Sequence, residues 1–382
     1  MTRLPIIAFF SCEFILPILS FITTVEIASA ICNIIVIFFL IGSLVVNKKS
    51  AKTMPWMIAV FSVAAFIITG IIYPEYQEVL YTGSGSWETV FAPRGGIVFM
   101  LLLTLINDPD EIFDSLKISA PIVWAAYTIR SISGVGLTGE AKYNHTYGYA
   151  FLFVSIVYLI CFFRERRPWQ IAISIVSLLQ VIMYASRTAF LSYVVFLALY
   201  ALFYDNDKRL KRRKIAFVIC GVILAFIVTS DAFLTFFSYM TRELGISSKI
   251  IDAIVSGENE LDGGRERAYE LAQSLLKKNP AGLGVYWDRY YCDIAYVHNF
   301  FYEILLDFGW VFGGLILIWL VKSIVTILRS DEKSWKILLI IFFCLSMIRL
   351  TLSYSFWLDK NFWGMIAVII GYKYATRKKH LK

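Results

Sequence analysis

The chain has 382 residues, of which 59% are hydrophobic and 17% charged, and its formal net charge is +8. Soluble globular domains carry about a quarter charged residues, so this composition excludes a water-soluble protein of this length. The excess of Lys and Arg does not indicate a nucleic-acid partner. Most of these residues lie between long apolar segments, on the side that the positive-inside rule assigns to the cytoplasm.

Apolar segments along the chain predict membrane-spanning helices, since one crossing of the hydrocarbon core takes about 20 helical residues. We expect an all-α polytopic membrane protein with about 12 transmembrane helices. The fourth segment is short. The tenth contains Gly309, Gly313 and Gly314, which predict a bend or a break. The predicted segments are 4–22, 24–46, 54–72, 94–107, 115–131, 147–163, 168–185, 187–204, 215–230, 298–328, 337–355 and 361–374.

Basic clusters between these segments predict the orientation. An N-terminus in the cytoplasm places every cluster inside, whereas the inverted protein would have every cluster outside. We therefore expect both termini in the cytoplasm. The clusters are Lys48–Lys52, Arg164–Arg167, Lys208–Lys214, Arg329–Lys336 and Arg377–Lys379.

This topology divides the chain into three parts: helices 1 to 9 (1–230), a long external loop (231–297), and helices 10 to 12 with a cytoplasmic tail (298–382). The loop contains an amphipathic helix of about four turns, which begins after Asp262 and ends before Asn279-Pro280. Arg265 leans toward its apolar stripe, and Arg267 lies at the edge. The stripe consists of Ala268, Leu271, Ala272, Leu275 and Leu276.

Several arginines lie at the predicted outer level of the membrane. Guanidinium groups pair with phosphate oxygens through two parallel hydrogen bonds and stay charged in any environment, so these arginines suit a diphosphate ligand. Alternatively, they extend to lipid headgroups or pair with acids. Arg349, deeper than the others, needs an acid partner or a hydrated cavity. The candidates are Arg94, Arg130, Arg187, Arg265, Arg267 and Arg349.

Two histidines are candidates for chemistry. His298, followed by Asn299, lies at the mouth of the tenth segment, where neutral imidazole can take a proton from a hydroxyl group. His145 lies outside the sixth segment and could line an acceptor site. For both, the alternative is a structural histidine at the interface. The third histidine, His380, belongs to the cytoplasmic tail.

The acidic residues do not predict a metal site. Asp108-Pro-Asp110-Glu111 looks like the DxD motif of metal-dependent glycosyltransferases, but the topology places it in the cytoplasm, where a polar turn is expected. Glu13 lies near the middle of the first segment and either pairs with Arg349 or stays protonated. The six cysteines form no metal-binding pattern. We expect no metal and no cofactor.

An ordered set of short motifs resembles the external loop of the O-antigen polymerase and O-antigen ligase superfamily. The set begins with Ser186-Arg187 at the outer end of a helix and continues with a Gly-Arg pair, an amphipathic helix, a Pro-x-Gly-x-Gly turn, a His-Asn pair and an apolar helix with a glycine break. The residues are Ser186-Arg187, Gly264-Arg265, Pro280, Gly282, Gly284, His298-Asn299 and Gly309.

The resemblance implies a reaction and its participants. Undecaprenyl-diphosphate-linked oligosaccharides would be donor and acceptor at the outer face of the bacterial cytoplasmic membrane, with membrane lipids, a chain-length regulator and a flippase as partners. Arg187 and Arg265 would neutralise the diphosphate, and His298 would activate the attacking hydroxyl. Asn299 would orient His298 or the sugar.

The modest length and the absence of a second histidine near His298 favour a polymerase over a ligase, whose acceptor is lipid A core. A transporter or flippase of lipid-linked glycans is the alternative from another class. Transporters usually place charges near the bilayer midplane, whereas the charges here gather at one face.

Overall fold

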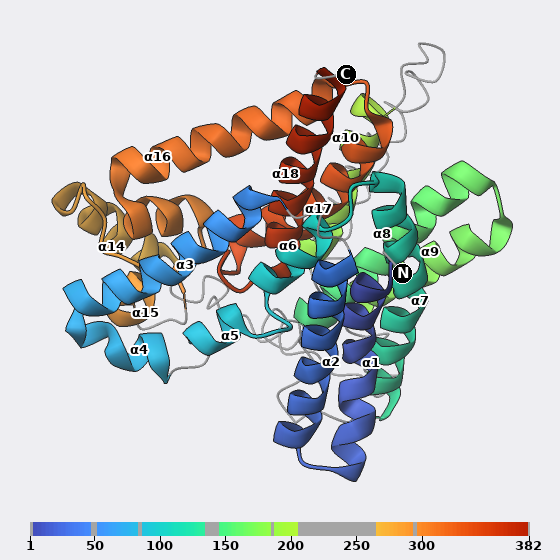
Figure 1. Cartoon of the computed structure of the whole chain (residues 1–382), viewed down its shortest axis with the longest axis horizontal. Helices are drawn as coiled ribbons and strands as arrows, with labels where there is room; N and C mark the ends of the chain where they lie inside the picture. Colours follow the sequence, from blue (N-terminus) through green and yellow to red (C-terminus); the bar gives the residue numbers. More distant parts are fainter. Residues whose placement is uncertain are drawn as a thin grey trace, which may run out of the picture. The chain divides into compact units, whose positions relative to one another are not determined.

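A computed structural model of the chain describes residues 3–46, 52–82, 86–133, 145–184, 187–204, 265–292 and 296–380. These residues form helices and no strand, which confirms the predicted all-α class (Figure 1). They belong to two units. Unit 1 comprises Met1–Pro5, Asn33–Glu111 and Gly263–Lys382, and unit 2 comprises Ile6–Cys32 and Ile112–Asp262.

Every predicted membrane segment except 215–230, which lies outside the described residues, contains a helix. The helices are α1 (Leu4–Ile22), α2 (Val25–Val46), α3 (Thr53–Ile72), α6 (Gly96–Thr104), α7 (Pro109–Ser133), α8 (His145–Glu165), α9 (Pro168–Met183), α10 (Arg187–Phe203), α16 (Phe300–Arg329), α17 (Lys333–Leu352) and α18 (Lys360–His380).

Five of the described helices are long and apolar enough to cross a membrane, namely α2, α3, α8, α16 and α17. The shorter helices α1, α9 and α10 are also apolar. The prediction of one crossing per segment is wrong for the fourth, because α6 has 9 residues. At 1.5 Å per residue this helix is about 14 Å long, roughly half of the hydrocarbon core. The chain is a polytopic membrane protein, with fewer clear spans in its described part than the sequence predicts.

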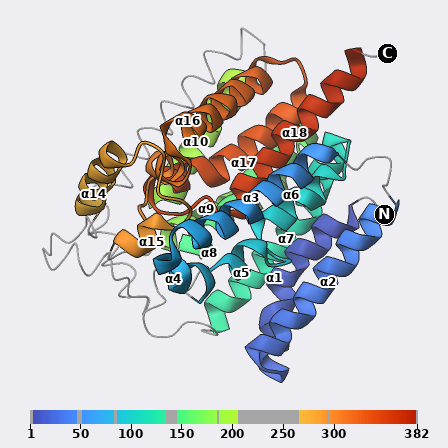
Figure 2. The ribbon, with the colours of Figure 1, turned by 60° about the vertical axis from the view of Figure 1, so that its left-hand side comes forward.

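The core of unit 1 is formed by α6, α17 and α18. α18 packs against both α6 and α17, and the three helices lie side by side in Figures 1 and 2. Almost every residue of α6 is buried, as is most of α17. A helix that is apolar on all sides is expected in such an interior position.

The amphipathic helix of the external loop is present as α14 (Arg265–Lys278). Ala268, Ala272 and Leu276 are buried, as the predicted stripe requires, and α14 packs against α16. Short helices that the sequence did not predict lie nearby in the chain: η2 (Pro74–Tyr76), α4 (Gln77–Tyr81), α5 (Trp87–Phe91) and α15 (Trp287–Tyr291).

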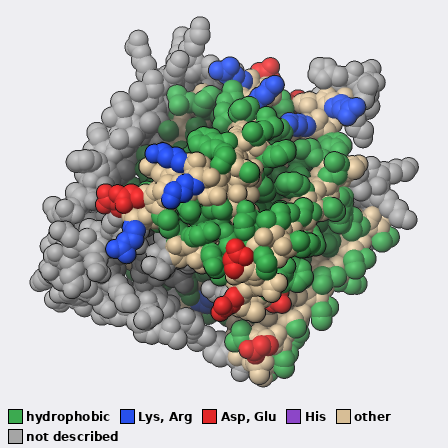
Figure 3. All heavy atoms as spheres, turned by 90° about the vertical axis from the view of Figure 1, so that its left-hand side faces the viewer, with side chains coloured by type: hydrophobic (Ala, Val, Ile, Leu, Met, Phe, Trp, Pro, Cys, Tyr) green, Lys and Arg blue, Asp and Glu red, His purple; other side chains and the backbone are tan. Residues whose placement is uncertain are grey.

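Hydrophobic side chains cover a broad area of one face of the molecule, with Lys, Arg, Asp and Glu at its margins (Figure 3). Many large apolar side chains are exposed on the helices themselves, including Ile71 of α3 and Phe312 of α16, which are 72% and 70% exposed. Water would oppose this exposure, but a lipid environment does not. The surface therefore agrees with the membrane assignment.

Unit 2 is organised around α8 and α9, which pack along each other. Ser155 of α8 and Ser174 of α9 exchange hydrogen bonds, each hydroxyl donating to the other residue's carbonyl at 2.9 Å. Small polar residues of this kind allow close helix contact in membranes. In the same unit the Tyr127 hydroxyl donates to the Glu13 carboxylate at 3.1 Å, so this acid has a tyrosine partner.

Candidate functional site

The Pro-x-Gly-x-Gly turn docks onto the break in α16. Gly309 has φ 76° and ψ 171°, so α16 consists of two helical pieces, as predicted. The Leu283 amide donates to the Leu306 carbonyl at 2.6 Å, and the Trp310 amide donates to the Pro280 carbonyl at 2.9 Å. The break therefore releases backbone groups of α16 that the turn then satisfies.

Both motif glycines at this contact are sterically required. A Cβ on Gly282 would lie 2.6 Å from the Gly309 nitrogen, and a Cβ on Gly309 would lie 2.6 Å from the Ala281 carbonyl group. Both residues have positive φ, which glycine adopts without strain. The separate motif elements Pro280, Gly282 and Gly309 are thus one packed contact.

His298 lies in the short connection between α15 and α16 and has a left-handed backbone with φ 54°. Its side chain is partly exposed. Two contacts hold the connection: the Val297 amide donates to the Asp288 carboxylate at 2.9 Å, and the Tyr269 hydroxyl of α14 donates to the His298 carbonyl at 3.2 Å. Non-glycine residues in this conformation cluster at functional sites, where surrounding contacts maintain them.

The neighbouring Asn299 has a capping role. Its side-chain oxygen accepts hydrogen bonds from the amides of Phe301 and Tyr302, at 3.0 and 3.3 Å, and so begins α16. The predicted role of Asn299 in orienting His298 or the sugar stays a prediction, and the helix cap uses its side-chain oxygen.

Two buried acids on the first turns of α16 bind the connection between α17 and α18. The Glu303 carboxylate accepts from the Ser355 hydroxyl and from the Phe356 amide, the latter at 3.1 Å. Asp307 accepts from the Trp357 indole at 2.7 Å. The acids are four residues apart, so they lie on the same face of the helix and fix a single connection.

Arg349 lies in the last turn of α17, just before the connection that these acids bind, and is 9% exposed. Its guanidinium lies 3.6 Å from the centre of the Tyr354 ring and 3.9 Å from the Asp359 carboxylate. Asp359 also accepts from the amides of Asn361 and Phe362, which cap α18. Burial raises the pKa of Asp359, and Arg349 opposes this change. The predicted need of Arg349 for an acid partner is met.

Aromatic contacts join His298 to Arg349. The Tyr296 ring lies 4.4 Å from the His298 ring and 5.8 Å from the Tyr354 ring, which in turn lies under Arg349. Two of the predicted site residues, 51 positions apart in the sequence, therefore meet in one cluster within unit 1.

α14 places the backbone of a third predicted residue beside this cluster. Arg265 is the first residue of α14, one turn before Tyr269, which contacts His298. Gln273, one further turn along, donates to the Tyr302 hydroxyl at 2.8 Å. α14 thus runs along the start of α16, with Arg265 at its N-terminal end.

The remaining predicted residues are placed as follows. In unit 1, Arg267 is exposed on α14, and the Arg94 guanidinium donates to the Asn33 side chain at 3.2 Å. In unit 2, Arg130 lies 5.3 Å from the Tyr127 ring, while Arg187 begins α10 and His145 begins α8. The side chains of Arg187, Arg265 and His145 lie outside the described residues, as do Ser186 and Gly264.

Sequence reasoning missed Arg289. Its side chain is 8% exposed, packs on the Tyr286 ring at 3.3 Å, and forms an ion pair with Asp288 at 3.5 Å. It also missed Glu303 and Asp307, although two acids four residues apart in an apolar segment are a signal of intramembrane polar contacts. No local signal identifies Arg289, because its burial depends on the packing of α15.

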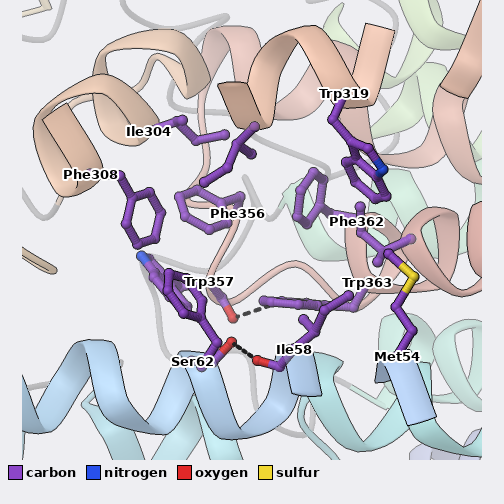
Figure 4. A pocket seen from close by; sticks show the side chains of 13 residues that line it. Met54, Ile58, Ser62, Ile304, Phe308, Trp319, Phe356, Trp357, Phe362 and Trp363 are labelled. Atoms are coloured by element: carbon purple, nitrogen blue, oxygen red, sulfur yellow. Dashed lines mark hydrogen bonds between the residues drawn. The ribbon is translucent and has the colours of Figure 1, made fainter. Parts of the chain in front are cut away.

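An apolar cavity of about 240 Å³ lies next to the acids (Figure 4). Its walls come from α3, both pieces of α16, the connection after α17, and α18. Phe356 and Trp357 line it, and their backbone amide and indole groups bind Glu303 and Asp307. The cavity wall and the acid contacts therefore share residues.

The Asp108 side chain forms a local turn at the start of α7, which begins at Pro109. The Asp108 carboxylate accepts from the Asp110 amide at 2.9 Å before the first turns of α7, and Asp110 accepts from the Ser334 hydroxyl at 2.9 Å. This confirms the polar-turn interpretation. Among the described residues, no group of three or more His, Cys, Asp or Glu side chains is placed to hold a metal ion.

The helices and the site define a polytopic membrane protein with buried arginines, acids and a partly exposed histidine beside an amphipathic helix. Residues 172–319 match the family model described as O-antigen ligase. Over this stretch the chain is similar to the O-antigen ligase family, which supports the resemblance found in the sequence. The match does not distinguish ligase from polymerase. Comparisons with curated proteins and with solved structures found no match.

Proposed function

We propose that the protein is a membrane glycosyltransferase that polymerises undecaprenyl-diphosphate-linked oligosaccharide repeat units, without a metal ion, at the outer face of the bacterial cytoplasmic membrane. The product would be an O-antigen, capsule or exopolysaccharide. The family match supports a reaction of the O-antigen ligase or polymerase type. The basic clusters in the sequence support the orientation, with both termini inside.

The observation that carries the proposal is the cluster in which Tyr296 and Tyr354 connect His298 to Arg349, beside the helix that begins at Arg265. A glycosyl transfer from a diphosphate needs a proton acceptor and fixed positive charge. The cluster supplies both kinds of group within one unit.

In the proposed reaction, His298 accepts the proton of an acceptor hydroxyl while that oxygen bonds to the sugar C1 of the donor. The bond between C1 and the diphosphate oxygen breaks, and its electron pair leaves with undecaprenyl diphosphate. Arg265 and Arg187 neutralise this leaving group, with Arg349 as a further phosphate contact. Arginine charge thereby takes the role that a divalent ion has in other transferases.

The other predicted residues have supporting roles in the proposal. Arg94, Arg130 and Arg267 would contact donor phosphates or lipid headgroups, and His145 would contribute to the acceptor site. The side-chain oxygen of Asn299 caps α16, so only the side-chain NH2 group of this residue remains for a sugar. A flippase would deliver the repeat units, and a chain-length regulator would limit the polymer.

The test is the reaction of purified protein with a synthetic undecaprenyl-diphosphate-linked oligosaccharide. A polymerase gives a ladder of longer glycans from this substrate alone. A ligase gives product only when lipid A core is added. The absence of glycan transfer in both arms refutes the proposal.

A transporter or flippase is the second candidate, and the buried Glu303 and Asp307 of α16 are the observation in its favour. A cysteine substituted at His298 distinguishes the two classes. A thiol reagent that cannot cross the membrane should label it from the outside only in the enzyme, and from both sides in a transporter.

A further inference from the structure

The apolar cavity between α3, α16 and α18 suits a hydrocarbon guest. Its volume is about 240 Å³. Two of its polar wall groups are used within the protein, since the Ser62 hydroxyl donates to the Ile58 carbonyl at 2.9 Å and the Trp357 indole donates to Asp307. Apolar cavities stay dry, and one of about 150 Å³ is large enough to bind benzene. The expected guest is therefore an alkyl chain.

The cavity reaches the apolar surface of the molecule. α18 packs against both α3 and α16. The Phe61 ring of α3 and the Phe308 ring of α16, 5.8 Å apart, bridge the two helices. Phe61 lines the cavity and is also exposed, as are Met57 of α3 and Leu315 of α16 on the surface nearby in the chain. A lipid chain therefore has access to the cavity from the membrane.

Positive charge lies at one end of this cavity. Trp319 and Met54 lie at that end, and Phe308 lies at the other (Figure 4). The Lys373 ammonium of α18 lies 4.7 Å from the centre of the Trp319 ring. Lys322 follows Trp319 by three positions in α16, so these two side chains are neighbours on the helix surface. Two lysines thus accompany the same cavity residue.

These lysines are available to an anion. Both are exposed, and neither forms an ion pair with an acid among the described residues. A third lysine lies close by, because the Lys52 ammonium is 6.0 Å from the centre of the Tyr374 ring, next to Lys373 in the chain. Clusters of lysines at a membrane surface attract anionic headgroups. The ligand that fits combines an alkyl chain with a negatively charged phosphate.

The position of the lysines indicates a lipid other than the proposed donor. His298 precedes the first piece of α16, whereas Trp319 and Lys322 belong to the second piece, after Gly309. A donor with its diphosphate beside His298 would approach the cavity from the opposite end. In the predicted orientation, Lys322 and Lys373 lie near the cytoplasmic ends of their helices, and the cytoplasmic leaflet is rich in anionic lipids.

We propose that the cavity binds one acyl chain of an anionic phospholipid, whose phosphate lies between Lys322 and Lys373. The site is separate from the cluster of His298 and Arg349 and does not depend on the reaction. Ile304 and Phe308 line the cavity on the first piece of α16. A bound chain therefore packs against the helical piece whose acids hold the connection between α17 and α18.

The experiment measures lipid binding to the full chain in detergent by native mass spectrometry. Phosphatidylglycerol should bind more tightly than phosphatidylcholine with the same acyl chains. The double variant Lys322→Gln/Lys373→Gln should weaken phosphatidylglycerol binding by about tenfold or more and leave phosphatidylcholine binding unchanged. The matched control is Lys333→Gln, at an exposed lysine at the start of α17. Ile58→Trp fills the cavity and should weaken binding of both lipids.

Three results overturn the proposal. The first is equal affinity for the two phospholipids, or phosphatidylglycerol binding that is unchanged in the double lysine variant. The second is unchanged binding in Ile58→Trp, because the chain then lies elsewhere; if this variant does not fold, Ile316→Phe decides in its place. The third is tighter binding of undecaprenyl phosphate than of phosphatidylglycerol with the same dependence on Ile58 and both lysines, which assigns the cavity to the carrier lipid.

Discussion

Substitution of Gly309 by alanine tests whether the break in α16 depends on the docked turn. Its φ of 76° and ψ of 171° lie in a region that only glycine populates readily, and forcing another residue there costs roughly 1–3 kcal/mol. The new Cβ would also lie 2.6 Å from the Ala281 carbonyl group, and overpacking costs roughly 1–3 kcal/mol. The sum, about 2–6 kcal/mol, is a large share of a typical unfolding free energy of about 5–15 kcal/mol.

The control for this variant lies in the same helix. A Cβ on Gly314 would meet nothing within 4 Å, and alanine in a helix interior is more stable than glycine by roughly 0.5–1 kcal/mol. Thermal unfolding in detergent, followed by tryptophan fluorescence, should therefore show a lower midpoint for Gly309→Ala and an equal or higher midpoint for Gly314→Ala. If both variants unfold at the same temperature, the explanation of the motif glycine is wrong.

Three further predictions concern His298 and two acids, Asp288 and Asp359, whose side chains contact Val297 and Arg349. His298→Ala should reduce glycan transfer by about 10²–10⁴-fold with little change in the unfolding midpoint, and full turnover would contradict its role as base. Asp288→Asn leaves only one side-chain acceptor oxygen, so unfolding should become easier by about 1–3 kcal/mol in the same thermal assay. Burial raises the pKa of Asp359, so the folded chain holds this proton more tightly. The free energy of unfolding then falls as the pH rises from about 3.9, the ordinary pKa of an unfolded Asp, through the folded-state pKa. Asp359→Asn should flatten this decline, measured as unfolding scans across pH.

Long apolar runs made the helices predictable from the sequence. A membrane helix satisfies its own backbone groups and needs only an apolar segment of sufficient length, so both properties are local. The break at Gly309 was also predictable, since glycine is a common cause of helix kinks. The short α6 was not, because the length of a helix within an apolar run depends on the packing around it.

The candidate site was predictable only in part. His298 and Arg349 were selected from residue type and position, and the structure brings them into one cluster. Their connection through Tyr296 and Tyr354 depends on how the segments before α16 and after α17 meet. The spacing of residues in the sequence does not show that these two segments pack together. Arg289 was missed for the same reason, since its local sequence resembles an exposed aromatic loop.

The first piece of α16 explains why the motifs occur in a fixed order. It begins at the Asn299 cap, beside His298, and ends at Gly309, where the Pro280 turn docks. Between these ends, Glu303 and Asp307 hold the connection that carries the aromatic partner of Arg349. Displacement of either end moves the acids and hence this connection. A glycine that contacts no substrate can therefore influence the placement of both the histidine and the arginine.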